Sequence, residues 1–496
     1  MAIEQNLSLA NSLVMSEPGQ SFHFDVAVVG GGSAGYAAAR TAADAGLRVV
    51  VIEGGKEVGG LCILRGCMPT KALLYAADVI HLAHHAGIWG IRTRDVQFNF
   101  GEVMARKDRL IQNFAEHRQQ QLASGPFKFI RAQARFLDAH TVALSNHETL
   151  TAKHFVLSTG SIVAPPPLPG LREIGYLTSD EALALTELPK SLLVLGGGAV
   201  GVEFAQFFAR FGVKVTLIQR SEHILSDFDT DAAMELEKVF RRDGMTVFTN
   251  TKLVDAWRDG EAKGVCFLHE GKIVKVGAEE ILLALGRIPN TASLSLDKAG
   301  VATDGRRIIT NALMQTSVPH IYAAGDCTSP HEIVHIAIQQ AEVAVHNLLH
   351  PDQPRSMDYR LLATVFFTDP QLAIVGLTEK EARAGGIPYL AASYPFHDHG
   401  KSMIMEALDG FVKLLANPVT GEIIGGSCVG PVGGELIHEV IAAMHKQMTV
   451  HELATMPHYH PTLAEIWMYP AEALAEGIQL PGHQYEPRSF LLEGSN

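Results

Sequence analysis

A glycine-rich turn between a strand and a helix occurs twice in this 496-residue chain. The first turn, at 30–35, lies between an apolar run at 24–29 and an alanine-rich stretch at 36–45. The next apolar run, 47–52, ends at Glu53. This pattern predicts a βαβ unit whose helix N-terminus holds a pyrophosphate and whose acid binds a ribose. The dinucleotide contacts expected here are Gly30, Gly32, Ser33, Gly35 and Glu53.

The second glycine turn, at 196–201, follows the apolar residues 191–195. A helix through Glu203 and a strand at 213–218 complete the same pattern. Two such units in one chain predict two bound dinucleotides. The contacts expected in this second unit include Gly196, Gly198 and Gly201.

Two cysteines, Cys62 and Cys67, stand between the two glycine units. In an ideal helix their alpha carbons would lie roughly 8.6 Å apart, whereas a disulfide spans at most about 6.8 Å. A bond between them therefore requires a distorted helix start, for which Gly66 gives the freedom. Such a strained bridge is readily reduced. Two free thiols are the alternative, but the neighbouring nucleotide motifs favour a redox pair.

Composition limits the possible partners and locations. Hydrophobic residues make up 47% of the chain and charged residues 19%, as in globular proteins with a large core. The length suggests roughly three domains. The net charge of −13 disfavours a nucleic-acid partner. No apolar run is long enough to predict a membrane span. The first twenty residues contain no Lys or Arg, which argues against a targeting signal and for a cytoplasmic protein.

The chain changes character in its last third. After Pro351, alternating runs such as 362–367 and 411–416 predict antiparallel strands, and 440–445 predicts an amphipathic helix. The proline-rich segment 164–170 predicts a domain junction. We therefore expect an α/β fold with two Rossmann-like dinucleotide-binding domains plus a C-terminal α+β domain.

Together these residues resemble the pyridine nucleotide-disulfide oxidoreductases, a family that includes dihydrolipoamide dehydrogenase, glutathione reductase and mercuric reductase. The likeness extends from about residue 24 to residue 467. The family's active-disulfide motif is matched by Gly59, Gly60, Cys62, Gly66, Cys67, Pro69 and Lys71. Further matches are the turns at 158–160 and 286–290, the acidic strand end at 324–326 and the segment 458–465.

The resemblance implies FAD in the first unit and NAD(P) in the second. It implies an FAD-binding domain over 1–160 and 288–352, an NAD(P)-binding domain over 161–287, and a dimerisation domain over 353–496. A homodimer with shared active sites is also implied. The resemblance adds Gly60, Lys71, Thr159, Gly160, Gly325 and Asp326 to the FAD contacts, and Gly286 to the NAD(P) contacts.

The same resemblance gives roles to the reactive side chains. Cys67 would touch the flavin, and Cys62 would exchange with the substrate. Lys71 would lie near the flavin's reactive nitrogen, paired with Glu203.

An acid–base pair is expected at the other end of the chain. Only a thiolate is a good nucleophile, so disulfide exchange needs a base, and imidazole titrates near neutrality. The resemblance assigns this role to His460, oriented by Glu465. Two His-x-His pairs, His458 with His460 and His397 with His399, also have a metal-ligand spacing, but no cysteine or carboxylate nearby completes a set and no metal site is predicted.

The residues of the second glycine unit point to different coenzymes, some to NADH and some to NADPH. Gly201 resembles the NAD-dependent branch. Gln219 replaces the NAD-type acid and is followed by Arg220, which suits a 2′-phosphate. Ser226 stands where a second such arginine is expected. NADPH is favoured slightly over NADH.

Other departures concern the substrate. Leu61 replaces a usual threonine, and Arg65 is either a helix-surface residue or a cation that acts on the thiols or on an anionic substrate. Val200 favours the dihydrolipoamide dehydrogenase or mercuric reductase type, whereas the tail 482–496 lacks the cysteine pair of mercuric reductase. We expect a dihydrolipoamide dehydrogenase-like enzyme acting in cell redox homeostasis. The alternatives are a reductase of another small disulfide, a metal-ion reductase, and a redox-sensing or complex-bound flavoprotein subunit.

Overall fold

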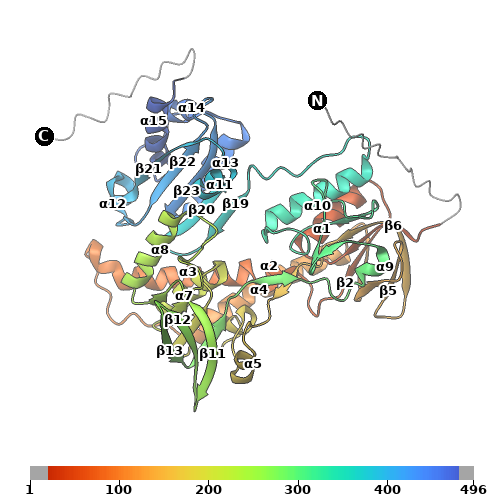
Figure 1. Ribbon diagram of the computed structural model, residues 1–496, viewed down its shortest axis with the longest axis horizontal. Helices are drawn as coiled ribbons and strands as arrows, with labels where there is room; N and C mark the ends of the chain where they lie inside the picture. The colour runs from red at the N-terminus through yellow and green to blue at the C-terminus, as the bar shows by residue number, and fades with distance from the viewer. Residues whose placement is uncertain (1–20, 480–496) are drawn as a thin grey trace, which may run out of the picture.

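The computed structural model describes residues 21–479. The N-terminal lead and the tail from residue 482, considered above, lie outside this range. The described chain forms three lobes, with α3 (Cys67–His85) and α7 (Ala199–Arg210) packed together between them (Figure 1). No helix in the described range combines the length and apolar character needed to cross a membrane.

The first lobe is built on a largely parallel sheet. β1 (Phe24–Val29) lies between β2 (Val49–Glu53) and β6 (Thr149–Leu157) and pairs in parallel with both. β18 (Ile321–Ala323) returns from far along the chain to pair with β6, so this lobe is discontinuous in sequence. Its other strands are β3 (Lys128–Arg131), β4 (Ala134–Phe136), β5 (Thr141–Leu144), β16 (Thr303–Asp304) and β17 (Arg307–Ile308).

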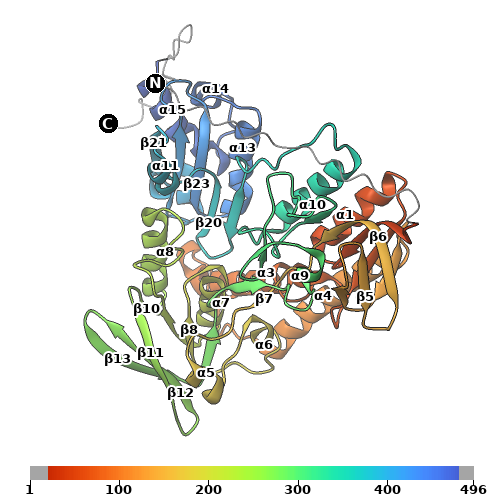
Figure 2. The same ribbon diagram turned by 45° about the vertical axis from the view of Figure 1, so that its right-hand side comes forward.

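Helices cover the faces of this sheet, as buried parallel strands require. α1 (Ser33–Asp44) and α10 (Val334–Leu349) lie side by side, which Figures 1 and 2 both show. The alanines of α1 permit this close packing, and most of them are buried. The remaining helices are α2 (Gly60–Leu64), η1 (Ala86–Trp89), α4 (Phe100–Ala123) and α9 (Leu296–Ala299).

The second lobe repeats the βαβ design. Its parallel sheet has the order β10 (Thr246–Phe248), β9 (Lys214–Ile218), β8 (Ser191–Leu195), β14 (Glu280–Leu283). An antiparallel sheet of β11 (Lys252–Asp259), β12 (Ala262–His269) and β13 (Lys272–Ala278) covers it. Two short strands that pair with each other, β7 (Ser161–Val163) and β15 (Arg287–Pro289), carry the chain between the lobes. Its helices are α5 (Pro169–Ile174), α6 (Ser179–Ala182), α7 and α8 (Thr230–Arg242).

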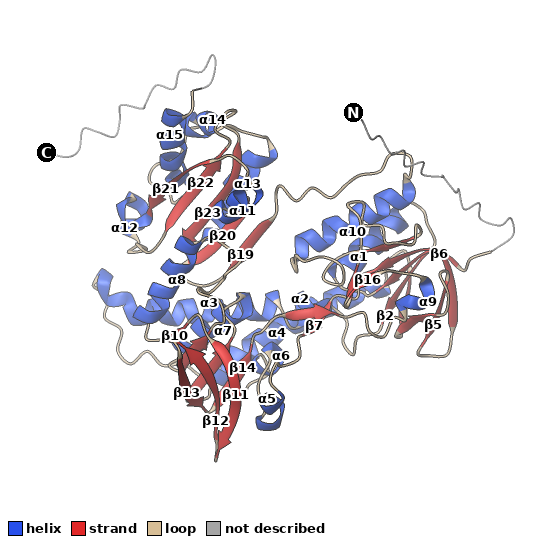
Figure 3. Cartoon of the chain, viewed as in Figure 1, coloured by secondary structure: helices blue, strands red, loops and turns tan. Residues whose placement is uncertain are grey.

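The third lobe is an antiparallel sheet backed by helices (Figure 3). Its strands are β19 (Ala363–Phe366), β20 (Gln371–Gly376), β23 (Ile423–Gly430), β22 (Phe411–Ala416) and β21 (Leu390–Pro395), in spatial order. Its helices are α11 (Glu379–Gly385), η2 (Phe396–Asp398), α12 (Gly400–Ile404), α13 (Gly433–His445), α14 (Val450–Thr455), η3 (Ala464–Trp467) and α15 (Met468–Gly477).

A buried cation joins the second lobe to the third. Lys413 of β22 is buried, and its Nζ lies 3.0 Å from Asp229, 2.7 Å from Asp231 and 2.9 Å from Glu379. Asp229 also accepts the backbone N–H groups of Glu379 and Lys380 at the start of α11. These contacts fix the third lobe against α8 of the second.

The expected α/β fold class is confirmed, and several elements match their predicted limits. The strands expected at 24–29, 191–195 and 411–416 are β1, β8 and β22. The helices begin earlier than predicted: α1 starts at Ser33 and α13 at Gly433. In α1 the first turn includes Gly35, where a Cβ would lie 1.8 Å from the carbonyl oxygen of Gly30; in α13 a Cβ on Gly433 or Gly434 would make tight contacts of 3.1 and 3.0 Å.

Candidate functional site

The first glycine turn is shaped by close backbone contacts. Gly30 has a positive φ of 109°, and a Cβ there would lie 2.3 Å from the carbonyl oxygen of Ser158. A Cβ on Gly35 would lie 1.8 Å from the carbonyl oxygen of Gly30. Both positions therefore require glycine. The turn leaves the N-terminus of α1 open toward a cavity, as a pyrophosphate site requires.

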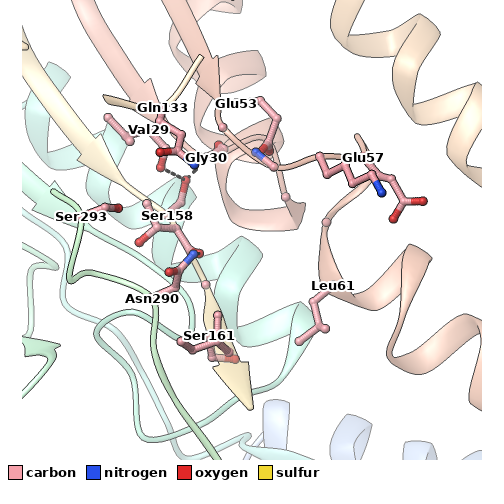
Figure 4. Close-up of a pocket in the computed structure, with 18 of the residues that line it drawn as sticks. Val29, Gly30, Glu53, Glu57, Leu61, Gln133, Ser158, Ser161, Asn290 and Ser293 are labelled. Carbon is pink, nitrogen blue, oxygen red and sulfur yellow. Dashed lines mark hydrogen bonds between the residues drawn. The ribbon is translucent and has the colours of Figure 1, made fainter. Parts of the chain in front are cut away.

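Glu53 holds this turn from the end of β2. Its Oε2 accepts the backbone N–H of Gly31 at 2.7 Å, and its Oε1 accepts that of Gly55 at 2.6 Å. Figure 4 shows Glu53 and Ser158 on the wall of the cavity, whose volume is about 390 Å³. The predicted FAD contacts on this wall are Gly30, Gly32, Glu53, Gly60, Thr159 and Gly160.

A second cavity of about 290 Å³ continues from the first. Gly32, Ser158 and Gly160 line both. The predicted residues on the second wall include Ser33, Cys62, Cys67, Lys71, Glu203, Gly325 and Asp326. Asp326 accepts a hydrogen bond from the Ser161 hydroxyl at 2.7 Å, and Ser161 in turn accepts one from Arg287. The tightly packed glycine turn, the acid of β2 and the two adjoining cavities fit an elongated dinucleotide such as FAD.

The two cysteines lie on either side of a break between helices. α2 ends at Leu64 and α3 begins at Cys67, while Arg65 and Gly66 leave helical geometry, with φ/ψ of −145°/13° and −126°/−114°. The expected distortion of the helix start is therefore present. Both thiols are free and partly buried, and they are hydrogen-bonded to each other. Two neighbouring thiols of this kind can interconvert with a disulfide.

The two thiols differ in acidity. The hydrogen bond from Cys62 lowers the pKa of Cys67 to about 7, against the effect of burial, and the charge of Lys71 lowers it further. Donation to Cys67 raises the pKa of Cys62, and burial adds to this shift. Cys67 is therefore the more acidic thiol of the pair and ionises first, while Cys62 keeps its proton.

Lys71 and Glu203 form a buried link between the lobes. The Nζ of Lys71 lies 2.9 and 2.8 Å from the two carboxylate oxygens of Glu203, which is 4% exposed. Glu203 also accepts the backbone N–H of Phe367 at 3.0 Å. Lys71 lies 4.7 Å from the centre of the Phe367 ring. One carboxylate on α7 thus connects the thiol helix α3 with the third lobe.

The acid–base candidates pair with each other, but not with the thiols of the same chain. His460 Nδ1 lies 3.0 and 3.2 Å from the two oxygens of the buried Glu465. The side chain of His460 is 77% exposed, and it lines neither of the two cavities. The dyad is therefore presented on the surface of the third lobe.

The second glycine turn has the geometry of the first. Gly196 has a φ of 107°, and a Cβ there would lie 2.3 Å from the carbonyl oxygen of Ala284. A Cβ on Gly201 would lie 1.9 Å from the carbonyl oxygen of Gly196. Gly198 precedes the first residue of α7 and has open space around it. The turn therefore leaves the start of α7 accessible to a pyrophosphate.

Side chains at the end of β9 complete this second turn. Gln219 Oε1 accepts the backbone N–H of Gly197 at 2.9 Å. Arg220 is exposed, and Gly286 has a φ of 99° with open space around it. A neutral amide thus holds the position at which the first unit has a carboxylate.

Other sequence candidates have structural partners. Arg65 is ion-paired with Glu57 and Asp180. His458 pairs with Glu439 at 2.6 Å. Within residues 21–479, no group of three or more His, Cys, Asp or Glu side chains is arranged to hold a metal ion.

Two contacts of the site were not found from the sequence. The N–H of Phe367 is a backbone group, so no pattern of residue types predicts its hydrogen bond to Glu203. His399 lies 3.4 Å from Glu465, although its spacing had suggested only a metal ligand. The first contact uses a backbone group and the second joins two side chains that no recognised motif pairs, so neither has a sequence signal.

Comparison with known proteins agrees with this geometry. Residues 24–345 match the family model of the pyridine nucleotide-disulphide oxidoreductases, and 362–471 match its dimerisation domain. The dihydrolipoyl dehydrogenase of Geobacillus stearothermophilus is 34% identical, over 90% of this chain and 95% of that protein. The mercuric reductase of Staphylococcus aureus is 31% identical, over 93% and 84%.

Solved structures have the same fold. The HOCl-induced flavoprotein disulfide reductase RclA from Escherichia coli matches with a TM-score of 0.80 at 27% identity, over 90% of this chain and 99% of that one. LpdA from Mycobacterium tuberculosis matches with a TM-score of 0.81 at 27% identity and the same coverage. The chain therefore belongs to the pyridine nucleotide-disulphide oxidoreductases, and it is a flavin-dependent, dihydrolipoyl dehydrogenase-like enzyme that couples a pyridine nucleotide to a disulfide.

Proposed function

We propose that the Cys62–Cys67 pair exchanges electrons with a small or lipoyl-type dithiol/disulfide substrate on one side and with a pyridine nucleotide on the other. Bound FAD would extend along the two adjoining cavities and supply the two-electron transfer between nicotinamide and disulfide. The observation that carries the proposal is the hydrogen-bonded thiol pair in the wall of the second cavity, beside Lys71.

The different acidities of the two thiols support different roles. Cys67, whose pKa is lowered, is the thiolate that would lie against a bound flavin. Lys71 stabilises this negative charge, and Glu203 holds Lys71 in place. Cys62, which keeps its proton, is the interchange thiol. It reacts once a base removes that proton.

Disulfide reduction then proceeds by two exchanges. Cys62 passes its proton to His460 of the partner subunit and attacks one sulfur of the substrate, whose S–S bond breaks. The leaving thiolate takes the proton back from that imidazole. Cys67 next attacks Cys62, which forms the Cys62–Cys67 disulfide and releases the second thiolate, to be protonated by water. The reverse sequence oxidises a dithiol.

A homodimer completes this arrangement. The exposure of His460 and of Tyr459 fits a dyad that serves a second copy of the chain. An apolar stripe on α3, formed by Tyr75, Val79 and Leu82, is also exposed and spaced by helical turns. The matched dimerisation domain supports the same assignment.

The second nucleotide unit is assigned to NADPH. Gln219 carries no charge that would repel a 2′-phosphate, and the exposed Arg220 follows it. We also keep the domain limits derived above, with the FAD domain at 1–160 and 288–352 and the NADPH domain at 161–287. The paired strands β7 and β15, which connect the lobes, support these limits. A cytoplasmic location belongs to the same proposal. The chain has only five cysteines, two of which form the redox pair, and this is too few for the disulfide framework of a secreted protein.

A substrate panel tests the function directly. The purified flavoenzyme is assayed with NADPH and NADH against lipoamide, glutathione disulfide and Hg(II), and with dihydrolipoamide in the reverse direction. We expect turnover with a disulfide that depends on Cys62. Turnover with Hg(II) alone would replace the proposal by metal-ion reduction. Bound FAD without turnover on any substrate would favour a redox sensor.

A further inference from the structure

Glu465 has a second imidazole beside it. His399, immediately before α12, is completely buried, and its Nε2 lies 3.4 Å from Glu465 Oε1. The same oxygen lies 3.2 Å from His460 Nδ1. Nε2 of His399 is buried without a hydrogen-bond partner among residues 21–479, and Glu465 Oε1 lies within ion-pair distance of it.

We propose that His399 is a positioning residue of the acid–base dyad, which donates from Nε2 to Glu465 and thereby fixes the carboxylate that orients His460. This inference rests on the proposed role of His460 in disulfide exchange. His399 touches neither substrate nor cofactor in this arrangement. It acts through Glu465, as outer partners of a catalytic histidine commonly do.

The other ring nitrogen determines which tautomer can donate. His399 Nδ1 lies 2.8 Å from the Ser402 hydroxyl. A hydroxyl that donates to Nδ1 leaves the proton on Nε2, which then faces Glu465. Burial lowers the pKa of His399, so the ring is neutral near pH 7. A neutral donor holds Glu465 without competing with His460 as a second cation.

The groups around His399 leave this assignment unchanged near neutral pH. Its ring lies 6.3 Å from that of Tyr469 on α15 and 6.5 Å from that of Phe396 on η2. Tyr469 stacks on Tyr394 of β21 at 4.0 Å. Burial raises the pKa of both tyrosines, so they are neutral. The charged or titratable groups that interact with this cluster are His460, Glu465, Glu472 and Asp398.

The test measures the titration of His460 itself. Diethyl pyrocarbonate modifies histidine only in its neutral form, and peptide mass spectrometry gives the rate at His460 at each pH in the dimeric flavoenzyme. His399→Leu removes the donor, so the charge of Glu465 acts on His460 alone and the midpoint should rise by about half a unit. His399→Gln retains an N–H at the position of Nε2 and should titrate as wild type. His84, exposed at the end of α3, is the internal control.

Each outcome decides the inference. A raised His460 midpoint in His399→Leu together with a wild-type midpoint in His399→Gln supports the inference. Midpoints equal to wild type in both variants, or equally raised in both, overturn it. If His399→Leu does not fold, Ser402→Ala replaces it. In Ser402→Ala, no hydroxyl fixes the tautomer of His399, so the midpoint of His460 should rise by less than in His399→Leu. An unchanged midpoint would overturn the inference. The midpoint does not depend on turnover. Failure of the proposed function would instead appear as a wild type that is inactive on every disulfide.

Discussion

Glu53 and Gln219 occupy equivalent places in the two nucleotide-binding turns. Each side chain accepts the backbone N–H of the second glycine in its turn, Glu53 at 2.7 Å and Gln219 at 2.9 Å. The second glycine of each turn is therefore held in the same way in both units, by a carboxylate in the first and by a neutral amide in the second. A carboxylate in this position favours the free ribose 2′-hydroxyl of NADH, whereas a neutral amide does not repel the 2′-phosphate of NADPH.

Restoring the charge should change the coenzyme preference. In Gln219→Glu, the added carboxylate repels the 2′-phosphate, so the ratio of kcat/KM for NADPH to that for NADH should fall by about 100-fold. Steady-state kinetics with both coenzymes measures this ratio. Arg220→Ala is the matched variant, and it should weaken NADPH by about 10-fold with little effect on NADH. An unchanged ratio in both variants would mean that selectivity lies elsewhere.

The two thiols should respond differently to replacement. Cys62→Ser should lose turnover by at least about 1,000-fold while keeping the long-wavelength absorbance that arises when a thiolate contacts the flavin. Cys67→Ser should lose this band because the thiolate itself is gone. Absorbance spectra of the FAD-loaded variants distinguish the two. A band that persists in Cys67→Ser and vanishes in Cys62→Ser would reverse the assigned roles.

The same band should depend on pH with a defined sign. The pKa of Cys67 is lowered to about 7, so in the reduced protein the band should be strong above pH 7 and fade as the pH falls through that value. Lys71→Met removes a charge that lowers the pKa, and its midpoint should rise by about one unit. Glu203→Gln removes a charge that raises it, and its midpoint should fall. Shifts in the same direction would contradict this electrostatic account.

Replacement of His460 should separate the two halves of the catalytic cycle. His460→Ala should slow disulfide exchange by about 100- to 10,000-fold, because no base remains for Cys62, and leave flavin reduction by NADPH nearly unchanged. Stopped-flow measurements follow each half alone. The control is His458→Ala, which removes a neighbouring imidazole that pairs with Glu439 instead. Equal losses in both halves would exclude a specific acid–base role.

The buried cation at the lobe junction should control stability. Lys413→Met leaves Asp229, Asp231 and Glu379 without their shared counter-charge. The free energy of unfolding should fall by about 3–5 kcal/mol. The control is Lys238→Met, which removes a lysine that is 65% exposed and pairs with Glu235 on the surface; about 0.5 kcal/mol is expected. Chemical denaturation measures both, and similar losses would argue against a special role for Lys413.

The sequence predicts those parts of the molecule that depend on local chemistry. The glycine turns require residues without a Cβ, so Gly30 and Gly196 marked the first turn of each βαβ unit correctly. The break at Gly66 followed from the reach of a disulfide. The strands of the third lobe were visible as alternating runs, such as 411–416.

What the sequence did not predict depends on contacts between distant segments. The bond from Phe367 to Glu203 uses a backbone group, and the pairing of His399 with Glu465 joins residues more than sixty positions apart. The partners of Arg65, likewise, are carboxylates whose proximity only the folded chain provides. Single residue types do not encode such geometry.

The bond from Phe367 to Glu203 has a consequence for how the enzyme can be observed. Glu203 binds Lys71, which lies beside Cys67. It also accepts the backbone N–H of Phe367 in the third lobe, through which two copies of the chain would meet. If the third lobe tilts when the dimer dissociates, Glu203 and Lys71 move with it, and the environment of the bound flavin changes. Dilution of the holoenzyme below the dissociation constant of its dimer should change its colour before it changes its secondary structure.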